Sequence, residues 1–331
     1  MALHAIDDLA DAYRATRSFL WPIEWDRWLR LALLSVFVAG TGGGGVPTGN
    51  LQFPFTGGPG TPGPVPGGEL PLDQLGVFLS RNLGLLLLIG LLGLLLLLFF
   101  QWIGATFEFA FLESLRTDEV HVRRYVREFR GPGTRLFAFR VGVGLLGLLL
   151  GGIVLLFGLA PILAGVPSAA PVLVLLFMLP VFLVFGIVGS VVYTFTTAFV
   201  APIMLMEDRG VISAWRRFWG VLTDAWTDFL VFVVVGLFVM LAIGIVVGIA
   251  LAVIGAALFL PVILAIVTAG PLVAAILGLP LAIVGILAWA LIQVPVQTYL
   301  RHWALLVLGD VEPDLDLISE RREAVRGETT E

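Results

Sequence analysis

Cysteine and lysine are both absent from this chain of 331 residues, and only three histidines occur. Without cysteine there is no disulfide framework, thiolate zinc site or cysteine nucleophile. Without lysine there is no Schiff-base or phosphate-loop lysine chemistry. His4, His121 and His302 lie far apart in the sequence, so the ligand spacing of a metal site is missing. We therefore expect neither a metal nor another cofactor.

Charged side chains are also scarce. They make up 13% of the residues, about half the 25% that is typical of soluble domains. Hydrophobic residues make up 59%, and the mean hydropathy is +1.03. This composition excludes a soluble enzyme, a nucleic-acid-binding domain and a disordered chain as the main body. It predicts an integral membrane protein.

The net charge of −5 is confined to the last 22 residues, which hold eight acidic residues and three arginines. The rest of the chain is electrically balanced. An acidic C-terminus together with an absence of lysine favours a halophilic, archaeal source. We predict a single membrane domain over 1–309, followed by an acidic cytoplasmic tail over 310–331.

Several apolar segments are long enough to cross the hydrocarbon core, which takes about 20 helical residues. They predict an all-α polytopic membrane protein with six transmembrane helices arranged as three hairpins. A Gly/Pro-rich segment over 41–75 follows the first and shortest span and is expected to be an outer loop. The predicted spans are 26–41, 82–113, 135–162, 171–205, 227–260 and 272–308.

Arginine sets the predicted topology. Eighteen of the 19 arginines precede the first span, follow the last or lie at the joins of spans two and three and of spans four and five, and only Arg81 lies near the other side. Because basic residues remain in the cytoplasm, both termini are expected to be cytoplasmic and the protein to reside in the cell membrane.

The chain also reads as three copies of one unit, over about 1–117, 118–207 and 208–309. Each unit would begin with an interfacial amphipathic helix. Thr106, Thr196 and Thr298 each precede an aspartate by twelve residues. The expected interfacial helices are 3–20, 119–130 and 210–223.

Small residues recur at four-residue spacing in two spans, a pattern that allows close helix contact in membranes. We expect packing faces at these positions: Gly147 and Gly151, and Gly244, Gly248, Ala252 and Ala256.

The segment from Phe199 to Trp219, FVAPIMLMEDRGVISAWRRFW, has a span ending near a proline, an acidic residue and an amphipathic helix with Ala, Trp and Phe. It resembles a recurrent segment of the six-helix membrane domain that is sometimes fused to glycerophosphodiester phosphodiesterases. That family also contains stand-alone archaeal proteins of unknown function. No catalytic phosphodiesterase domain is present here, so the resemblance implies the membrane fold and no hydrolase activity.

Polar side chains within or near the spans are the candidate ligand or transport path, because charge in hydrocarbon is costly and often functional. The alternative interpretation of the charged members is a structural ion-pair belt that ties the hairpins together. The candidates are Gln101, Glu108, Arg140, Thr194, Thr197, Asp228, Gln293 and Arg301.

Arginines on the interfacial helices are the candidate contacts to anionic lipid headgroups. With a membrane adjacent, we expect no nucleic-acid partner. The candidates are Arg123, Arg124, Arg127, Arg216 and Arg217.

No catalytic motif is found. The sequence therefore favours a non-enzymatic membrane scaffold or accessory protein that binds anionic lipids, partner proteins or further copies of itself. A permease or exporter subunit is the alternative, and a lipid-modifying enzyme the third. A continuous polar cavity reaching Gln101, Thr194 and Gln293 would favour transport, and a solid apolar core would favour the scaffold.

Overall fold

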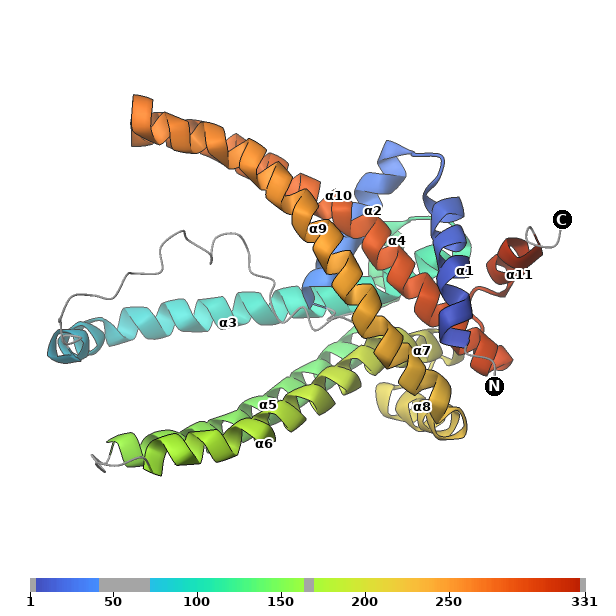
Figure 1. Ribbon diagram of the computed structural model, residues 1–331, viewed down its shortest axis with the longest axis horizontal. Coiled ribbons are helices and arrows are strands. Elements are labelled where there is room, and N and C mark those ends of the chain that lie inside the picture. Colours follow the sequence, from blue (N-terminus) through green and yellow to red (C-terminus); the bar gives the residue numbers. More distant parts are fainter. Residues whose placement is uncertain (1–3, 42–71, 164–169, 328–331) are drawn as a thin grey trace.

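The computed structural model describes residues 4–41, 72–163 and 170–327, and every regular element within these ranges is a helix. A compact base carries three long arms that diverge from it (Figure 1). The predicted loop over 41–75 falls almost entirely outside the described residues.

The arms consist of long helices whose sequences are apolar on every face, as expected for segments surrounded by lipid. One arm is the outer part of α3 (Leu72–Thr117), the second pairs α5 (Arg130–Leu163) with α6 (Ala170–Phe195), and the third pairs α9 (Trp226–Ala269) with α10 (Pro271–Val311). Leucine and isoleucine side chains along the arms are mostly exposed, which suits contact with acyl chains.

The base contains the inner ends of the arms and the short helices around them. Its core is aromatic, with Phe199, Phe218 and Phe229 buried against one another. The elements that complete it are α1 (His4–Leu20), α2 (Trp25–Thr41), α4 (Val122–Glu128), the π-helix η1 (Thr196–Val200), α7 (Ala201–Glu207), α8 (Val211–Asp224), η2 (Pro313–Leu315) and α11 (Ser319–Gly327).

Five helices of the described residues are long and apolar enough to cross a membrane, so the predicted count of six is not confirmed. The predicted span that is missing from these five is the first, over 26–41, which forms helix α2. Helix α2 has 17 residues and extends about 25 Å, short of the roughly 30 Å hydrocarbon core. Leu31, Leu34 and Val38 of α2 are fully buried in the base. The apolar character of α2 therefore serves packing within the protein.

The predicted amphipathic helices form as α1, α4 and α8, with slightly different ends. Two of the register-matched aspartates, Asp118 and Asp208, both adopt left-handed backbone conformations directly after a helix, whereas Asp310 lies within α10. The internal repeat and its boundaries remain a prediction.

The glycine faces do not pack as the sequence predicted. A Cβ atom added at Gly147, Gly244 or Gly248 would meet no other atom within 4 Å. The closest approach lies instead at Gly133 of α5, where an added Cβ would come within 2.8 Å of the Thr106 Cα of α3. The tightest approach at a glycine therefore lies in the base and not along the predicted glycine faces.

Candidate functional site

Charged side chains from different arms meet inside the base. Glu108 comes from α3, Arg140 from α5 and Arg301 from α10, and their residues are between 0 and 7% exposed. We call these three residues the Arg–Glu–Arg triad. Thr197 of η1 is fully buried beside them. The sequence named all four as candidates, and the structure brings them together.

The Glu108 carboxylate lies between the two guanidinium groups. Its Oε1 is 2.5 Å from Nη2 of Arg301, and its Oε2 is 3.4 Å from Nη2 of Arg140. Arg140 also donates a hydrogen bond to the Thr197 hydroxyl at 3.0 Å, and Arg301 donates one to the Thr197 carbonyl at 3.3 Å. The triad therefore joins all three arms at one point.

Local sequence explains why the Thr197 carbonyl is free to accept this hydrogen bond. In the π-helical turn, the Ala201 amide donates to the Thr196 carbonyl, five residues back. The next amide in that register would come from position 202, which is a proline and has no N–H. Such π-helical turns often occur at functional sites. The proline at position 202 thus follows a π-helical turn that leaves an acceptor available to Arg301.

The triad carries one carboxylate against two guanidinium groups, so its formal charge is +1. Nε and Nη1 of Arg140 and Nε of Arg301 are buried and have no hydrogen-bond partner among the described residues. The Arg140 guanidinium lies 5.1 Å from the centre of the Tyr193 ring, a cation–π contact. This contact compensates part of the excess charge and leaves the N–H donors unused.

The other predicted path residues lie apart from the triad. Gln101, Thr194 and Gln293 are half-buried on the arms, outward from the triad members of the same chain segments. Asp228 is half-buried at the start of α9, and no ion pair joins it to the triad within the described ranges.

The predicted headgroup arginines divide into two kinds. Arg123, Arg124 and Arg127 of α4 and Arg216 of α8 are exposed. The first three line a shallow surface hollow together with Glu128. Arg217 is half-buried, 2.8 Å from Glu312, and this ion pair attaches α8 to the end of α10.

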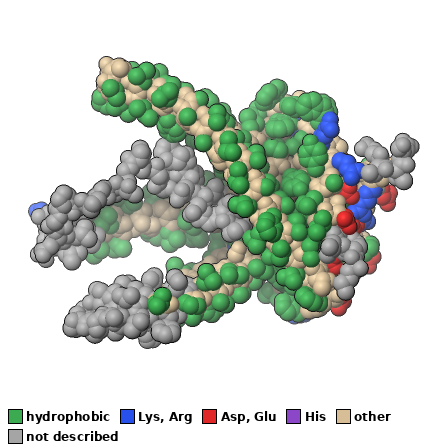
Figure 2. All heavy atoms as spheres, in the orientation of Figure 1, with side chains coloured by type: hydrophobic (Ala, Val, Ile, Leu, Met, Phe, Trp, Pro, Cys, Tyr) green, Lys and Arg blue, Asp and Glu red, His purple; other side chains and the backbone are tan. Residues whose placement is uncertain are grey.

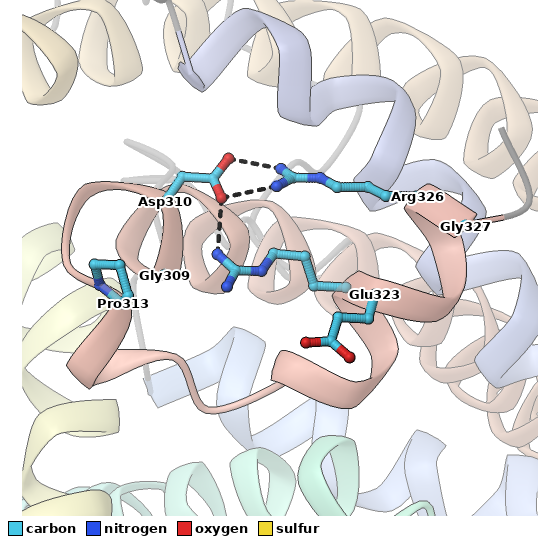
Figure 3. A pocket seen from close by; sticks show the side chains of 7 residues that line it. Gly309, Asp310, Pro313, Glu323, Arg326 and Gly327 are labelled. Carbon is cyan, nitrogen blue, oxygen red and sulfur yellow. Dashed lines mark hydrogen bonds and ion pairs between the residues drawn. The ribbon is translucent and has the colours of Figure 1, made fainter. Parts of the chain in front are cut away.

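A second charged cluster, which we call the tail latch, was not predicted. Arg326 of α11 lies 2.8 Å from Asp8 and 3.0 Å from Asp11, both on α1, and 2.6 Å from Asp310 at the end of α10. Arg322 also pairs with Asp310, at 2.8 Å (Figure 3). The latch holds the acidic C-terminal segment against the base. The four-residue spacing of Arg322 and Arg326 places them on one helix face, and this spacing could have indicated an ion-pairing surface. Nothing in the sequence indicates that α1 is its partner.

Asp8 titrates in an unusual range. Burial, with the nearby Asp310 carboxylate as the second cause, raises the pKa of Asp8 from its ordinary 3.8 to about 7, although Arg326 opposes the shift. The fold therefore favours the neutral form of Asp8. The resulting stabilisation is present at low pH and is lost as the pH rises from about 4 to about 7.

We expect thermal unfolding of the detergent-purified protein to occur at a lower temperature at about pH 8 than at about pH 5.5. Asp8→Asn should reduce that difference, because the amide cannot ionise. Asp7→Asn is the matched control, since Asp7 is the exposed neighbour on the same helix. Equal pH dependence in the wild type and Asp8→Asn would contradict the assignment.

Comparison with known proteins gives one match. No curated protein and no solved structure matches the chain. The resemblance to the domain fused to glycerophosphodiester phosphodiesterases finds no support in the match that was obtained. The profile that does match covers residues 3–318 and describes a family of unknown function, DUF7544. The chain, whose described residues form only helices, five of them apolar enough to span a membrane, belongs to that family.

Proposed function

We propose that this protein is a non-enzymatic membrane scaffold that anchors anionic lipids at the cytoplasmic surface. The observation that carries the proposal is the separation of side-chain types along the molecule. Charged residues gather over the base, whereas the arms are covered with hydrophobic side chains (Figure 2). This separation is what a bilayer requires of a protein whose base lies at the interface.

The lengths of the arms support this placement. Thirty residues separate Arg301 from Pro271 at the tip of α10, and 28 separate Glu108 from Ser80 on α3. At a rise of 1.5 Å per residue these distances are about 45 and 42 Å. They match the roughly 40–45 Å thickness of a bilayer with its headgroups. The triad would then lie at the level of the inner headgroups.

Helix α4 supplies the contacts that favour anionic lipid. Its Tyr125 is buried in the base, while Arg123, Arg124 and Arg127 are exposed. A basic side chain near an anionic surface contributes about 1 kcal/mol. Three such residues on one short helix favour enrichment of anionic lipids around it.

The test is the lipid composition around the protein after extraction in polymer-bounded discs from vesicles containing equal amounts of phosphatidylglycerol and phosphatidylcholine. We expect enrichment of phosphatidylglycerol, and we expect the triple variant Arg123→Gln, Arg124→Gln and Arg127→Gln to reduce it several-fold. The matched Arg→Lys triple variant retains the charges and should retain the enrichment. No enrichment in the wild type would refute the proposal.

Topology can be tested separately, because the chain has no native cysteine. A cysteine at position 124 or 213 is expected to react with a membrane-impermeant thiol reagent only from the cytoplasmic side. A cysteine at position 58, which lies outside the described residues, should react from the outer side. Labelling of either inner position from outside would reverse the proposed orientation.

A permease remains the second candidate. The observation that favours it is the set of half-buried polar side chains on the arms, Gln101, Thr194 and Gln293. In a transporter such residues would line a solute path. Tight retention of a soluble small molecule by the purified protein, with no preference among lipids, would favour this function over the scaffold.

A further inference from the structure

We propose that the point where the three arms diverge binds one anionic phospholipid, with its phosphate on Arg140 and Arg301 and its acyl chains between the arms. This site is distinct from the exposed arginines of α4. The inference rests on the proposed placement of the base at the membrane interface, because that placement brings the triad to the level of lipid phosphates.

The first argument is charge. Two guanidinium groups face one carboxylate in a site that is 0–7% exposed. An uncompensated charge in such surroundings is costly, so buried ions are usually paired. Glu108 is already shared between both arginines. One further negative charge would balance the site, and a phosphodiester carries a single negative charge.

The second argument is hydrogen bonding. Nε and Nη1 of Arg140 and Nε of Arg301 are buried donors without partners in the described part of the chain. Buried donors are nearly always satisfied in folded proteins. Charge-assisted hydrogen bonds from guanidinium N–H groups to phosphate oxygens are strong. A phosphate therefore meets the charge requirement and the donor requirement together, because its several oxygens can accept from donors that point in different directions, whereas a chloride ion is a single acceptor.

The third argument is the polar surroundings on the outward side of the triad. Tyr193 lies one helical turn outward from Thr197, Gln101 lies two turns outward from Glu108, and Gln293 lies about two turns outward from Arg301. These spacings of four, seven and eight residues keep each side chain on the same helix face as Thr197 or as the triad member of its own helix. All three are half-buried. They lie where the glycerol and ester groups of a lipid would follow its phosphate into the membrane.

The fourth argument is the exposed apolar surface of the arms. The arms separate outward from the base and run as individual rods (Figures 1 and 2). Side chains along them, such as Leu95 on α3 and Leu241 on α9, are 55 and 62% exposed. Within a bilayer, acyl chains must cover these surfaces. The phosphate site at the triad would select an anionic lipid from among the lipids that cover the arms. A free phosphate ion has no acyl chains to cover these surfaces, so the proposed ligand is a lipid.

Gly144 provides a test that leaves the triad intact. It lies one turn outward from Arg140 on the same face of α5, and an added Cβ would meet no atom within 4 Å. Gly144→Leu should therefore fold normally while its side chain obstructs the approach to Arg140. Gly142→Leu is the matched control, because Gly142 is equally open but faces the opposite side of α5.

The measurement is native mass spectrometry of protein reconstituted with equal amounts of phosphatidylglycerol and phosphatidylcholine and then washed in detergent. We expect about one retained phosphatidylglycerol per chain, a loss of retention of about tenfold or more in Gly144→Leu, and wild-type retention in Gly142→Leu. Arg140→Gln should remove the preference for phosphatidylglycerol over phosphatidylcholine. Circular dichroism of each variant confirms that it is folded.

Four outcomes would overturn the site: no retained lipid, equal retention in Gly144→Leu, retention without preference for the anionic lipid, or displacement of the lipid by millimolar inorganic phosphate. The last would identify a soluble anion as the ligand. Lipid retention at the triad can be distinguished from the enrichment of phosphatidylglycerol around α4. If the discs show enrichment but no lipid survives washing, only the internal site fails. If one lipid is retained without enrichment, the scaffold proposal fails and the site stands.

Discussion

Glu108→Gln is expected to lower the free energy of unfolding by about 3–5 kcal/mol, the range found when one partner of a buried ion pair is removed. The neutral amide leaves Arg140 and Arg301 facing each other without the carboxylate that they share. Because these residues come from α3, α5 and α10, the loss affects the junction of all three arms. Unfolding of the detergent-purified protein by heat or by sodium dodecyl sulfate measures the change.

The matched control is Glu128→Gln on α4. Glu128 is exposed and lies 3.8 Å from Arg124 within the same helix, so we expect a change of at most about 0.5 kcal/mol. A double variant provides a second check. Adding Arg301→Gln to Glu108→Gln returns the formal charge of the cluster to +1, so its destabilisation should be smaller than the sum of the two single changes. Additive effects, or a Glu108→Gln protein as stable as wild type, would contradict the role of the triad.

Gly133→Ala is expected to destabilise the protein by about 1–3 kcal/mol, the usual cost of overpacking a close contact. The added Cβ would lie 2.5 Å from the Thr106 Oγ1 and 2.8 Å from the Thr106 Cα. Helices α3 and α5 would have to move apart at their crossing, because a backbone atom cannot rotate away. The free energy of unfolding measures this change too.

Gly131→Ala, two residues earlier on α5, is the control. A Cβ there would meet no atom within 4 Å, so alanine should leave the stability unchanged or raise it by up to about 1 kcal/mol through helix propensity. Thr106→Ala in the Gly133→Ala background removes the hydroxyl but not the backbone contact, so we expect only partial rescue. Complete rescue would show that the side chain, and not the backbone, sets the distance between the helices.

Much of the architecture could be predicted because membrane helices are governed by local composition. The apolar runs predicted the arm helices, and the distribution of arginine predicted that charge would gather at one end. All three triad members were among the candidates, because a charge within or near a span is costly and often functional. Asp228 was chosen on the same ground, but position along a helix does not determine which neighbour its face meets.

The remaining features depend on pairing between distant segments. Helix α2 has the composition of a short span, yet its buried leucines show that it packs within the base. Glycines at regular spacing on α9 are open, whereas the single Gly133 makes the close crossing. The tail latch joins Asp8 to Arg326 across almost the whole chain, and no local pattern specifies that contact.

The sequence by itself determined that several long segments are helices apolar enough to span a membrane, and that all but one of the arginines lie toward the same end of these segments. Each of these properties follows from the cost of placing backbone polar groups and charges in hydrocarbon, a cost that acts on each segment independently. The tertiary structure alone decided that three arms diverge from one base, that two arginines share one carboxylate where they meet, and that the acidic tail docks on the first helix. Those features depend on which helix faces come into contact, and the hydrophobic effect that drives a chain into lipid does not distinguish one apolar face from another.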